Sequence, residues 1–190
     1  MHGYWLGTYE RESVETFAAA IQSGMTVWDV GANIGYYTLL ARRLVGPAGQ
    51  VVAIEPLPVN LAALRAHLAL NGFGDVDVVE AAAAATSGTA RFRMTDSPGE
   101  GYFDGDGEIE VATIALDTLT ERLPHVVKID VEGFADLVLR GADRILEHHP
   151  VILLATHPRT GEPARCRGIL DRFGYTVRPT RTDPDVWICH

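Results

Sequence analysis

The sequence is poor in cysteine and in positive charge. Its 190 residues include only two cysteines, Cys166 and Cys189, which show neither the pattern of a disulfide framework nor the spacing of a zinc site. Lysine and arginine number 16 against 25 aspartates and glutamates, so the net charge is -9 and the clustered positive charge of a nucleic-acid surface is missing. We therefore expect reduced thiols, a cytoplasmic protein and no nucleic-acid partner.

Long hydrophobic runs are also missing. No apolar stretch reaches the roughly 18 residues of a membrane span. The start of the chain, MHGYWLGTYERES, lacks the basic-then-apolar layout of a signal peptide. With 47% hydrophobic residues the chain can bury a substantial core, so we expect no membrane association and a single domain over 1–190. Within it, 1–24 is expected to be an N-terminal helical segment and 25–190 the core.

Apolar strands alternate with amphipathic helices along most of the chain. Strands are predicted at Thr26–Val30, Gln50–Glu55, Asp75–Val79, Thr89–Met94, Glu108–Ile114, His125–Val131 and Pro150–Thr156, and helices at Glu10–Ser23, Ile34–Leu44, Val59–Asn71, Phe134–His148 and Gly161–Phe173. The segments Tyr175–Pro179 and Val186–Cys189 are predicted to form an antiparallel hairpin, and Thr95–Gly107 an exposed loop. This order predicts an α/β, Rossmann-like three-layer sandwich with a mostly parallel sheet.

A glycine turn follows the first predicted strand, where such sheets bind their ligands. A dinucleotide fingerprint would place glycine at positions 31, 33 and 36, but the residues are Gly31, Asn33 and Tyr36. A nicotinamide cofactor is therefore disfavoured. The spacing is instead Asp29-x-Gly31-x-Asn33-x-Gly35, and an acid beside the turn repels phosphate and attracts ammonium or sulfonium.

A second acid, Glu55, ends the next apolar strand, where a carboxylate typically accepts hydrogen bonds from ribose hydroxyls. A plain tight turn and a solvated strand end would account for each feature alone. Their joint position in one β-α-β unit favours a ligand that combines adenosine with a cationic amino acid, and S-adenosylmethionine is such a ligand.

The chain resembles the FkbM family of S-adenosylmethionine-dependent methyltransferases. The resemblance rests on segments in the order typical of that family: LGTYE (Leu6–Glu10), WDVGANIGYYTLL (Trp28–Leu40), VVAIEPLPVNLAALRAHLALNG (Val51–Gly72), TIALDTL (Thr113–Leu119), KIDVEG (Lys128–Gly133) and VLRGA (Val138–Ala142). It implies a Class I methyltransferase fold, a seven-stranded sheet that ends in an antiparallel hairpin, and methyl transfer to a hydroxyl of a sugar or natural product.

The same resemblance implies which residues hold the cofactor. The methionine part would be surrounded by Asp29, Gly31, Asn33 and Gly35, and the ribose held by Glu55. Pro56 and the turn Glu80–Ala82, in which Ala82 is the predicted contact, would lie near the adenosine.

The fourth strand of the core brings further acids to the same edge of the sheet. Methyl transfer requires an aligned acceptor oxygen and removal of its proton, and the candidates to accept that proton are Asp130, Glu132 and His157. Histidine titrates closest to neutrality, whereas a carboxylate would need a pKa raised by burial. Asp130 and Glu132 are the only two obvious oxygen ligands, so no metal is expected.

Two positions depart from the family pattern. Ala135 stands two residues beyond the glycine of KIDVEG, where the family often carries an acid, and the segment Ala155-Thr156-His157 stands where an acid often follows the fifth strand. These departures leave open an alternative in which the chain binds S-adenosylmethionine but has lost catalysis. Acceptor identity and oligomeric state are not determined by the sequence.

Overall fold

The computed structural model describes residues 11–94, 101–103, 106–119, 121–157 and 161–190. The segment LGTYE and much of the predicted loop Thr95–Gly107 lie outside the described residues. Among the described helices, none is long and apolar enough to cross a membrane.

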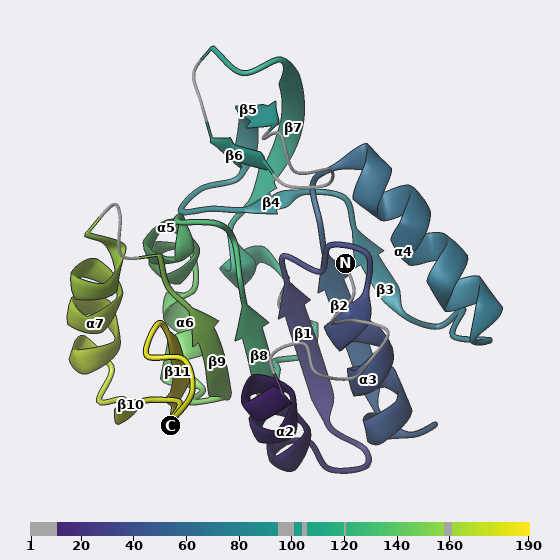
Figure 1. Ribbon diagram of the computed structural model, residues 1–190, viewed down its shortest axis with the longest axis horizontal. Helices are drawn as coiled ribbons and strands as arrows, with labels where there is room; N and C mark the ends of the chain where they lie inside the picture. Colours follow the sequence, from purple (N-terminus) through teal and green to yellow (C-terminus); the bar gives the residue numbers. More distant parts are fainter. Residues whose placement is uncertain (1–10, 95–100, 104–105, 120, 158–160) are drawn as a thin grey trace.

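A seven-stranded sheet forms the centre of the molecule, as predicted (Figure 1). Its order is β10-β11-β9-β8-β1-β2-β3, built from β1 (Thr26–Val30), β2 (Gln50–Ile54), β3 (Asp77–Val79), β8 (Val126–Ile129), β9 (Val151–Ala155), β10 (Val177–Pro179) and β11 (Val186–Cys189). The pairs among β9, β8, β1, β2 and β3 are parallel, whereas β11 is antiparallel to both β9 and β10. The carboxyl ends of the parallel strands therefore meet at one edge.

Helices cover both faces of this sheet, which confirms the predicted three layers. One face packs against α2 (Arg11–Ala20), α3 (Tyr36–Val45) and α4 (Pro58–Leu70), and the other against α5 (Ala135–Arg140), α6 (Asp143–Glu147) and α7 (Glu162–Arg172). Alternate residues of β1 point to opposite layers, since Val27 packs with the layer of α2, α3 and α4 and Trp28 with the layer of α5, α6 and α7. Most predicted elements are present, with small shifts at their ends.

The helix predicted at Phe134–His148 is wrong as one element, because it breaks between α5 and α6. A side chain at Gly141 would overlap the carbonyl group of Ala84, so the chain passes close to that backbone at this point. A new helix then begins, because the Asp117 carboxylate accepts hydrogen bonds from the N–H groups of Arg144 and Ile145. Both causes come from residues distant in sequence.

A second, smaller sheet stands beside the carboxyl edge of the large one, at the top of Figure 1. Its order is β4-β7-β5-β6, with β4 (Ala82–Ala83), β5 (Gly88–Met94), β6 (Gly101–Phe103) and β7 (Ile109–Ile114). The strands at β5 and β7 were predicted, but β6 falls within the segment expected to be a loop. Phe92 and Val111 pack with Leu57 and Ala82, which brings this sheet against the start of α4.

Candidate active site

The turn after β1 is held against both neighbouring strands. The N–H groups of Gly31 and Ala32 donate to the carbonyl oxygen of Ile54, at 2.9 and 3.0 Å. Gly31 has a φ of +77°, and a Cβ atom there would overlap the backbone carbonyl of Asp130. Glycine is therefore required because the tips of β1 and β8 approach each other too closely for any side chain.

The second glycine of the motif has a different neighbour. A Cβ atom on Gly35, whose φ is +96°, would overlap the side chain of Leu64. Its bare backbone therefore lets the start of α3 pack against α4. Gly31 is among the residues that line the neighbouring cavity and Gly35 is not, so a contact between Gly35 and a cofactor stays a prediction.

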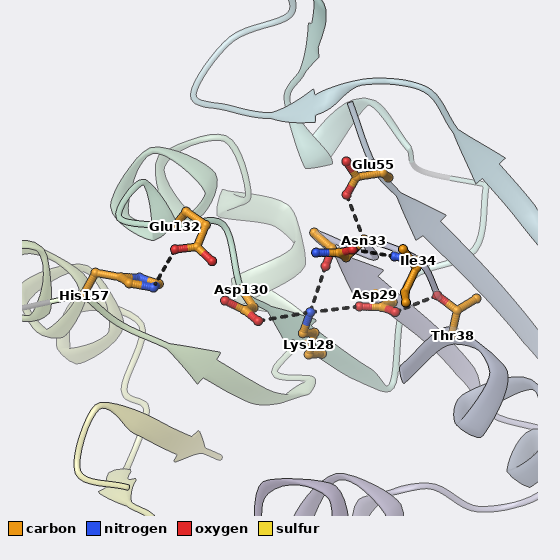
Figure 2. Close-up of polar contacts among 10 residues, drawn as sticks. Asp29, Asn33, Ile34, Thr38, Glu55, Lys128, Asp130, Glu132 and His157 are labelled. Carbon is orange, nitrogen blue, oxygen red and sulfur yellow. Dashed lines mark hydrogen bonds and ion pairs between the residues drawn. The ribbon is translucent and has the colours of Figure 1, made fainter. Parts of the chain in front are cut away.

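Asp29 is completely buried beneath the turn. Its Oδ2 atom accepts a hydrogen bond from the Thr38 hydroxyl at 2.6 Å, and its Oδ1 atom lies 3.4 Å from the Nζ atom of Lys128 (Figure 2). The ammonium of Lys128 also donates to the Gly31 carbonyl at 2.9 Å and lies 3.6 Å from Asp130. Lys128 thus ties the tips of β1 and β8 together, and Asp29 holds that lysine in place.

Glu55, just beyond β2, organises the opposite wall. Its Oε2 atom accepts from the N–H of Asn33 at 2.9 Å, whereas Oε1 accepts from the N–H of Leu57 and the side-chain amide of Asn60. Burial raises the pKa of Glu55, against the opposing effect of these hydrogen bonds. A carboxylate has four lone-pair directions, so Glu55 retains capacity to accept from a ligand.

A cavity opens between these two walls. It is lined by the turn after β1, by Glu55 and its neighbours, by the small sheet and by the tip of β8: Gly31, Ala32, Asn33, Ile34, Tyr36, Tyr37, Ile54, Glu55, Pro56, Leu57, Asn60, Ala81, Ala82, Ala83, Phe92, Lys128, Asp130, Val131 and Glu132. Of the residues predicted to hold the cofactor, the cavity brings together Gly31, Asn33, Glu55, Pro56 and Ala82. The apolar wall near Phe92 and the buried carboxylate of Glu55 fit a nucleoside, while Asp130 offers negative charge at the other end.

A second cavity adjoins the first. Its lining includes Ser13, Tyr37, Lys128, Ile129, Asp130, Glu132, Leu153, Ala155, His157, Asp183 and Val186. Tyr37, Lys128, Asp130 and Glu132 line both cavities. The predicted catalytic acids therefore lie at the junction of the two cavities, and His157 lies in the second.

Glu132 and His157 form an ion pair at this junction. The Oε2 atom of Glu132 lies 3.3 Å from the Nε2 atom of His157, and the Nδ1 atom lies 3.7 Å from the buried carboxylate of Glu162. These carboxylates, Glu132 first, raise the pKa of His157 to about 10, and His157 in turn lowers the pKa of Glu132. The imidazole is therefore protonated at neutral pH.

A metal at this junction would need the same three side chains. One donor atom each from Asp130, Glu132 and His157 lie within 4.8 Å of one another. A protonated imidazole has no free lone pair for a cation, so a metal would have to displace that proton. The absence of a metal stays a prediction on this ground.

The ion pair predicts a specific pH dependence of stability. Since folding raises the pKa of His157 from 6.5 to about 10, its stabilising contribution is complete below pH 6.5 and is lost as the pH rises through about 10. The lowered pKa of Glu132 adds a contribution that is complete above pH 4.5 and is lost as the pH falls below that value. We expect the difference in Tm between the native protein and His157→Gln to be largest between pH 4.5 and 6.5. Thermal unfolding across a pH series measures it, and a difference that persists unchanged above pH 10 would contradict the ion pair.

Several residues of the site were not predicted from the sequence. Thr38, Asn60, Phe92 and Glu162 each contact or line it. Thr38 lies in the first turn of α3 and Asn60 in the first turn of α4, where a polar residue carries no pattern that distinguishes it as part of a site. The acidic first turn of α7 was the single available signal for Glu162, and such residues are normally exposed.

Sequence comparison identifies the family of this chain and several of its relatives. The family model described as "Methyltransferase FkbM domain" matches residues 29–177. The hexuronic acid methyltransferase AglP of Haloferax volcanii is 25% identical over 154 residues, which cover 78% of this chain and 62% of that protein. The 31-O-demethyl-FK506 methyltransferase FkbM of Streptomyces tacrolimicus is 48% identical over 59 residues, which cover 31% of this chain and 20% of that protein.

The fold is also found in solved structures. The structure of methyltransferase FkbM from Methylobacillus flagellatus superposes with a TM-score of 0.67 at 19% identity, over 89% of this chain and 44% of the other. This chain thus spans less than two thirds of each of these relatives. The match over residues 29–177 includes the turn after β1, Glu55 and the acids that follow β8, Asp130 and Glu132. The chain belongs to the methyltransferase FkbM domain family, whose cofactor is S-adenosylmethionine.

Proposed function

We propose that the protein is an S-adenosylmethionine-dependent O-methyltransferase that acts on a hydroxyl group of a sugar or natural product. The observation that carries the proposal is the junction of two cavities at Asp130 and Glu132. The first cavity has the buried carboxylate and apolar wall that suit the cofactor. The second gives an acceptor access to the same two acids.

The named activities of relatives support this acceptor class. One relative is a hexuronic acid methyltransferase and another methylates 31-O-demethyl-FK506. Hexuronic acid and 31-O-demethyl-FK506 are both small molecules that carry hydroxyl groups. The second cavity is lined by Ser13, Asp183 and His157 beside the shared acids, and these polar groups suit a hydroxylated ligand.

The chain's own residues perform the acid–base part of the reaction. When bound, S-adenosylmethionine supplies an electrophilic methyl group on a positively charged sulfur. Asp130 accepts the proton of the acceptor hydroxyl, since its carboxylate lies at the junction and is held by Lys128. His157 is protonated and therefore unsuited to be the base, but its ion pair with Glu132 fixes that carboxylate at the junction.

The proposal extends to partners and location. The acceptor is a small molecule, and nucleic acid is not a partner, because the chain carries a net charge of -9. A membrane is not expected as a partner either, since none of the described helices is long and apolar enough to cross one. Both cysteines are buried and free, and burial raises the pKa of each thiol to about 12. Such unreactive thiols suit the reducing cytoplasm.

Two measurements test the proposal. Calorimetric titration with S-adenosylhomocysteine should show binding, and incubation of the protein with S-adenosylmethionine and a panel of sugars and hydroxylated natural products should give a methylated product. Binding without turnover on any acceptor would favour the second candidate, a binding module that has lost catalysis. The resemblance leads us to expect acids at or near Ala135 and Ala155, and their replacement leaves this candidate open. No binding of S-adenosylhomocysteine would contradict both.

Glu55→Gln is expected to weaken S-adenosylhomocysteine binding by about tenfold or more. The amide of glutamine has one acceptor oxygen, so it cannot serve the N–H groups of both Asn33 and Leu57 and still accept from ribose. Calorimetry measures the change. Glu15→Gln, in an exposed ion pair on α2, is the control and should leave the affinity unchanged. An unchanged Kd in Glu55→Gln would remove Glu55 from the cofactor site.

A further inference from the structure

Glu162 is a charged residue that the proposed chemistry does not use. It begins α7, and glutamate in the first turn of a helix usually points to solvent, where it complements the helix dipole. The side chain of Glu162 is instead completely buried. A buried carboxylate is costly unless hydrogen bonds compensate for the lost water, so its partners indicate why it is retained.

Those partners belong to two loops at the carboxyl edge of the sheet. The Oε1 atom of Glu162 accepts from the backbone N–H of Ala135 at 2.5 Å, and the Oε2 atom accepts from the backbone N–H of His157 at 2.6 Å. Ala135 follows the loop after β8, which carries Glu132, and His157 lies in the loop after β9. One carboxylate therefore fixes both loops that contribute to the second cavity.

The same carboxylate also faces the imidazole of His157. Its Oε2 atom lies 3.7 Å from Nδ1, while Glu132 lies 3.3 Å from Nε2 on the other side of the ring. Asp130 is the third acid near the ring, and Lys128 and Asp183 line the same cavity. The ring is thus oriented by carboxylates at both nitrogen atoms, one buried and one at the cavity junction.

Backbone conformation adds to the need for such a restraint. Glu132 has a φ of +48°, which non-glycine residues rarely adopt, and Gly133 follows with a φ of +93°. Strained conformations persist only where the surrounding structure holds them. Glu162 supplies a fixed point two residues after this pair, where it accepts the hydrogen bond from the N–H of Ala135.

We propose that Glu162 is a positioning residue of the acceptor side: it fixes the loops after β8 and β9 relative to each other and, with Glu132, orients the imidazole of His157. This inference rests on the proposed function for the identity of the second cavity as the acceptor site. It adds a residue that touches neither cavity directly but determines the geometry of two residues that do.

The structure offers a matched control in the same pair of helices. Asp136 of α5 is also buried and forms an ion pair with Arg165 of α7, at 2.8 Å. This second link between α5 and α7 lines neither cavity. Asp136→Asn therefore removes a polar contact between the same helices without a direct effect on the site.

The test compares the native protein with Glu162→Gln, Glu162→Asp and Asp136→Asn. Proton NMR follows the titration of the His157 imidazole, assigned with His157→Gln, and calorimetry gives the affinity for S-adenosylhomocysteine. In Glu162→Gln we expect the pKa of His157 to fall by about one pH unit or more, because the negative charge near Nδ1 is removed, and in Glu162→Asp we expect a smaller fall. Cofactor affinity should stay within about twofold in both variants. Asp136→Asn should leave the His157 titration unchanged. Glu162→Asp retains a negative charge and serves as the second variant if the glutamine variant fails to fold, but the aspartate side chain is too short to bridge both loops.

Turnover provides the second readout. On an acceptor that the native protein methylates, Glu162→Gln should lower kcat by about 10- to 100-fold without a change in KM for S-adenosylmethionine. An unchanged His157 titration in the Glu162 variants, or an equal shift in Asp136→Asn, would overturn the proposal. If the native protein binds S-adenosylhomocysteine but methylates no acceptor, the proposed function fails, whereas the imidazole titration still decides whether Glu162 positions His157.

Discussion

Gly31→Ala is expected to abolish cofactor binding. A Cβ atom at this position would overlap the backbone carbonyl of Asp130, and the residue would have to keep a φ of +77°. The overlap between this Cβ atom and the Asp130 carbonyl can be relieved only if the tip of β1 or β8 shifts. Such a shift is opposed because hydrogen bonds hold the turn to Ile54 and Lys128 bridges the two strands. We expect the free energy of unfolding to fall by about 3 kcal/mol, because backbone strain and overpacking both destabilise the folded state.

The Gly31 prediction has a close control in Gly72. Gly72 has a similar φ of +70°, but a Cβ atom there would meet no atom within 4 Å. Gly72→Ala therefore includes the backbone strain without the overlap. Calorimetry with S-adenosylhomocysteine and thermal unfolding should show normal binding and a smaller loss of stability in Gly72→Ala. Equal behaviour of the two variants would mean that the close approach of β1 and β8 does not shape the cofactor site.

Asp130→Asn is expected to lower methyl transfer by about a hundredfold or more while cofactor binding is retained. Asparagine keeps the size of the side chain but cannot take the acceptor's proton. Lys128 still has Asp29 and the Gly31 carbonyl as partners, so the tips of β1 and β8 should stay together. Rates of methyl transfer and calorimetry on the same preparation separate the two effects.

Two variants make the Asp130 experiment decisive. Asp75→Asn removes a carboxylate from an ion pair with Arg42 outside both cavities and should leave the rate unchanged. Glu132→Gln tests the other acid at the junction. If Glu132→Gln loses the rate and Asp130→Asn does not, Glu132 is the base and the assignment of Asp130 is wrong.

Local sequence patterns predicted the sheet and most helices because each strand and helix carries its own periodicity. The break between α5 and α6 could not be predicted in this way. It depends on the carbonyl of Ala84 and on the Asp117 carboxylate, which approach only after the chain has folded. The strand β6 was missed for a related reason, since its pairing with β5 compensates for a Gly-rich, acidic sequence.

On the cofactor side, too, the sequence predicted some features and only the folded structure shows others. The pattern around Asp29 and Gly31 indicated a ligand turn, and the turn lines the cavity. The sequence interpretation gave Asp29 a direct role with the ligand, which stays a prediction. In the structure this carboxylate is buried against Thr38 and Lys128, because the parallel register places Asp29 beside Lys128.

The sequence by itself determined the class of fold, the family and the edge of the sheet where the chemistry lies, because these follow from periodicity and from short motifs at strand ends. Tertiary structure alone decided how the acceptor side is built. Glu132, His157 and Glu162 come from three separate segments, and they meet because β8 and β9 are parallel neighbours with α7 packed beside α5. The charge of His157 depends on that meeting, since an isolated imidazole titrates near neutrality and one held between two carboxylates does not.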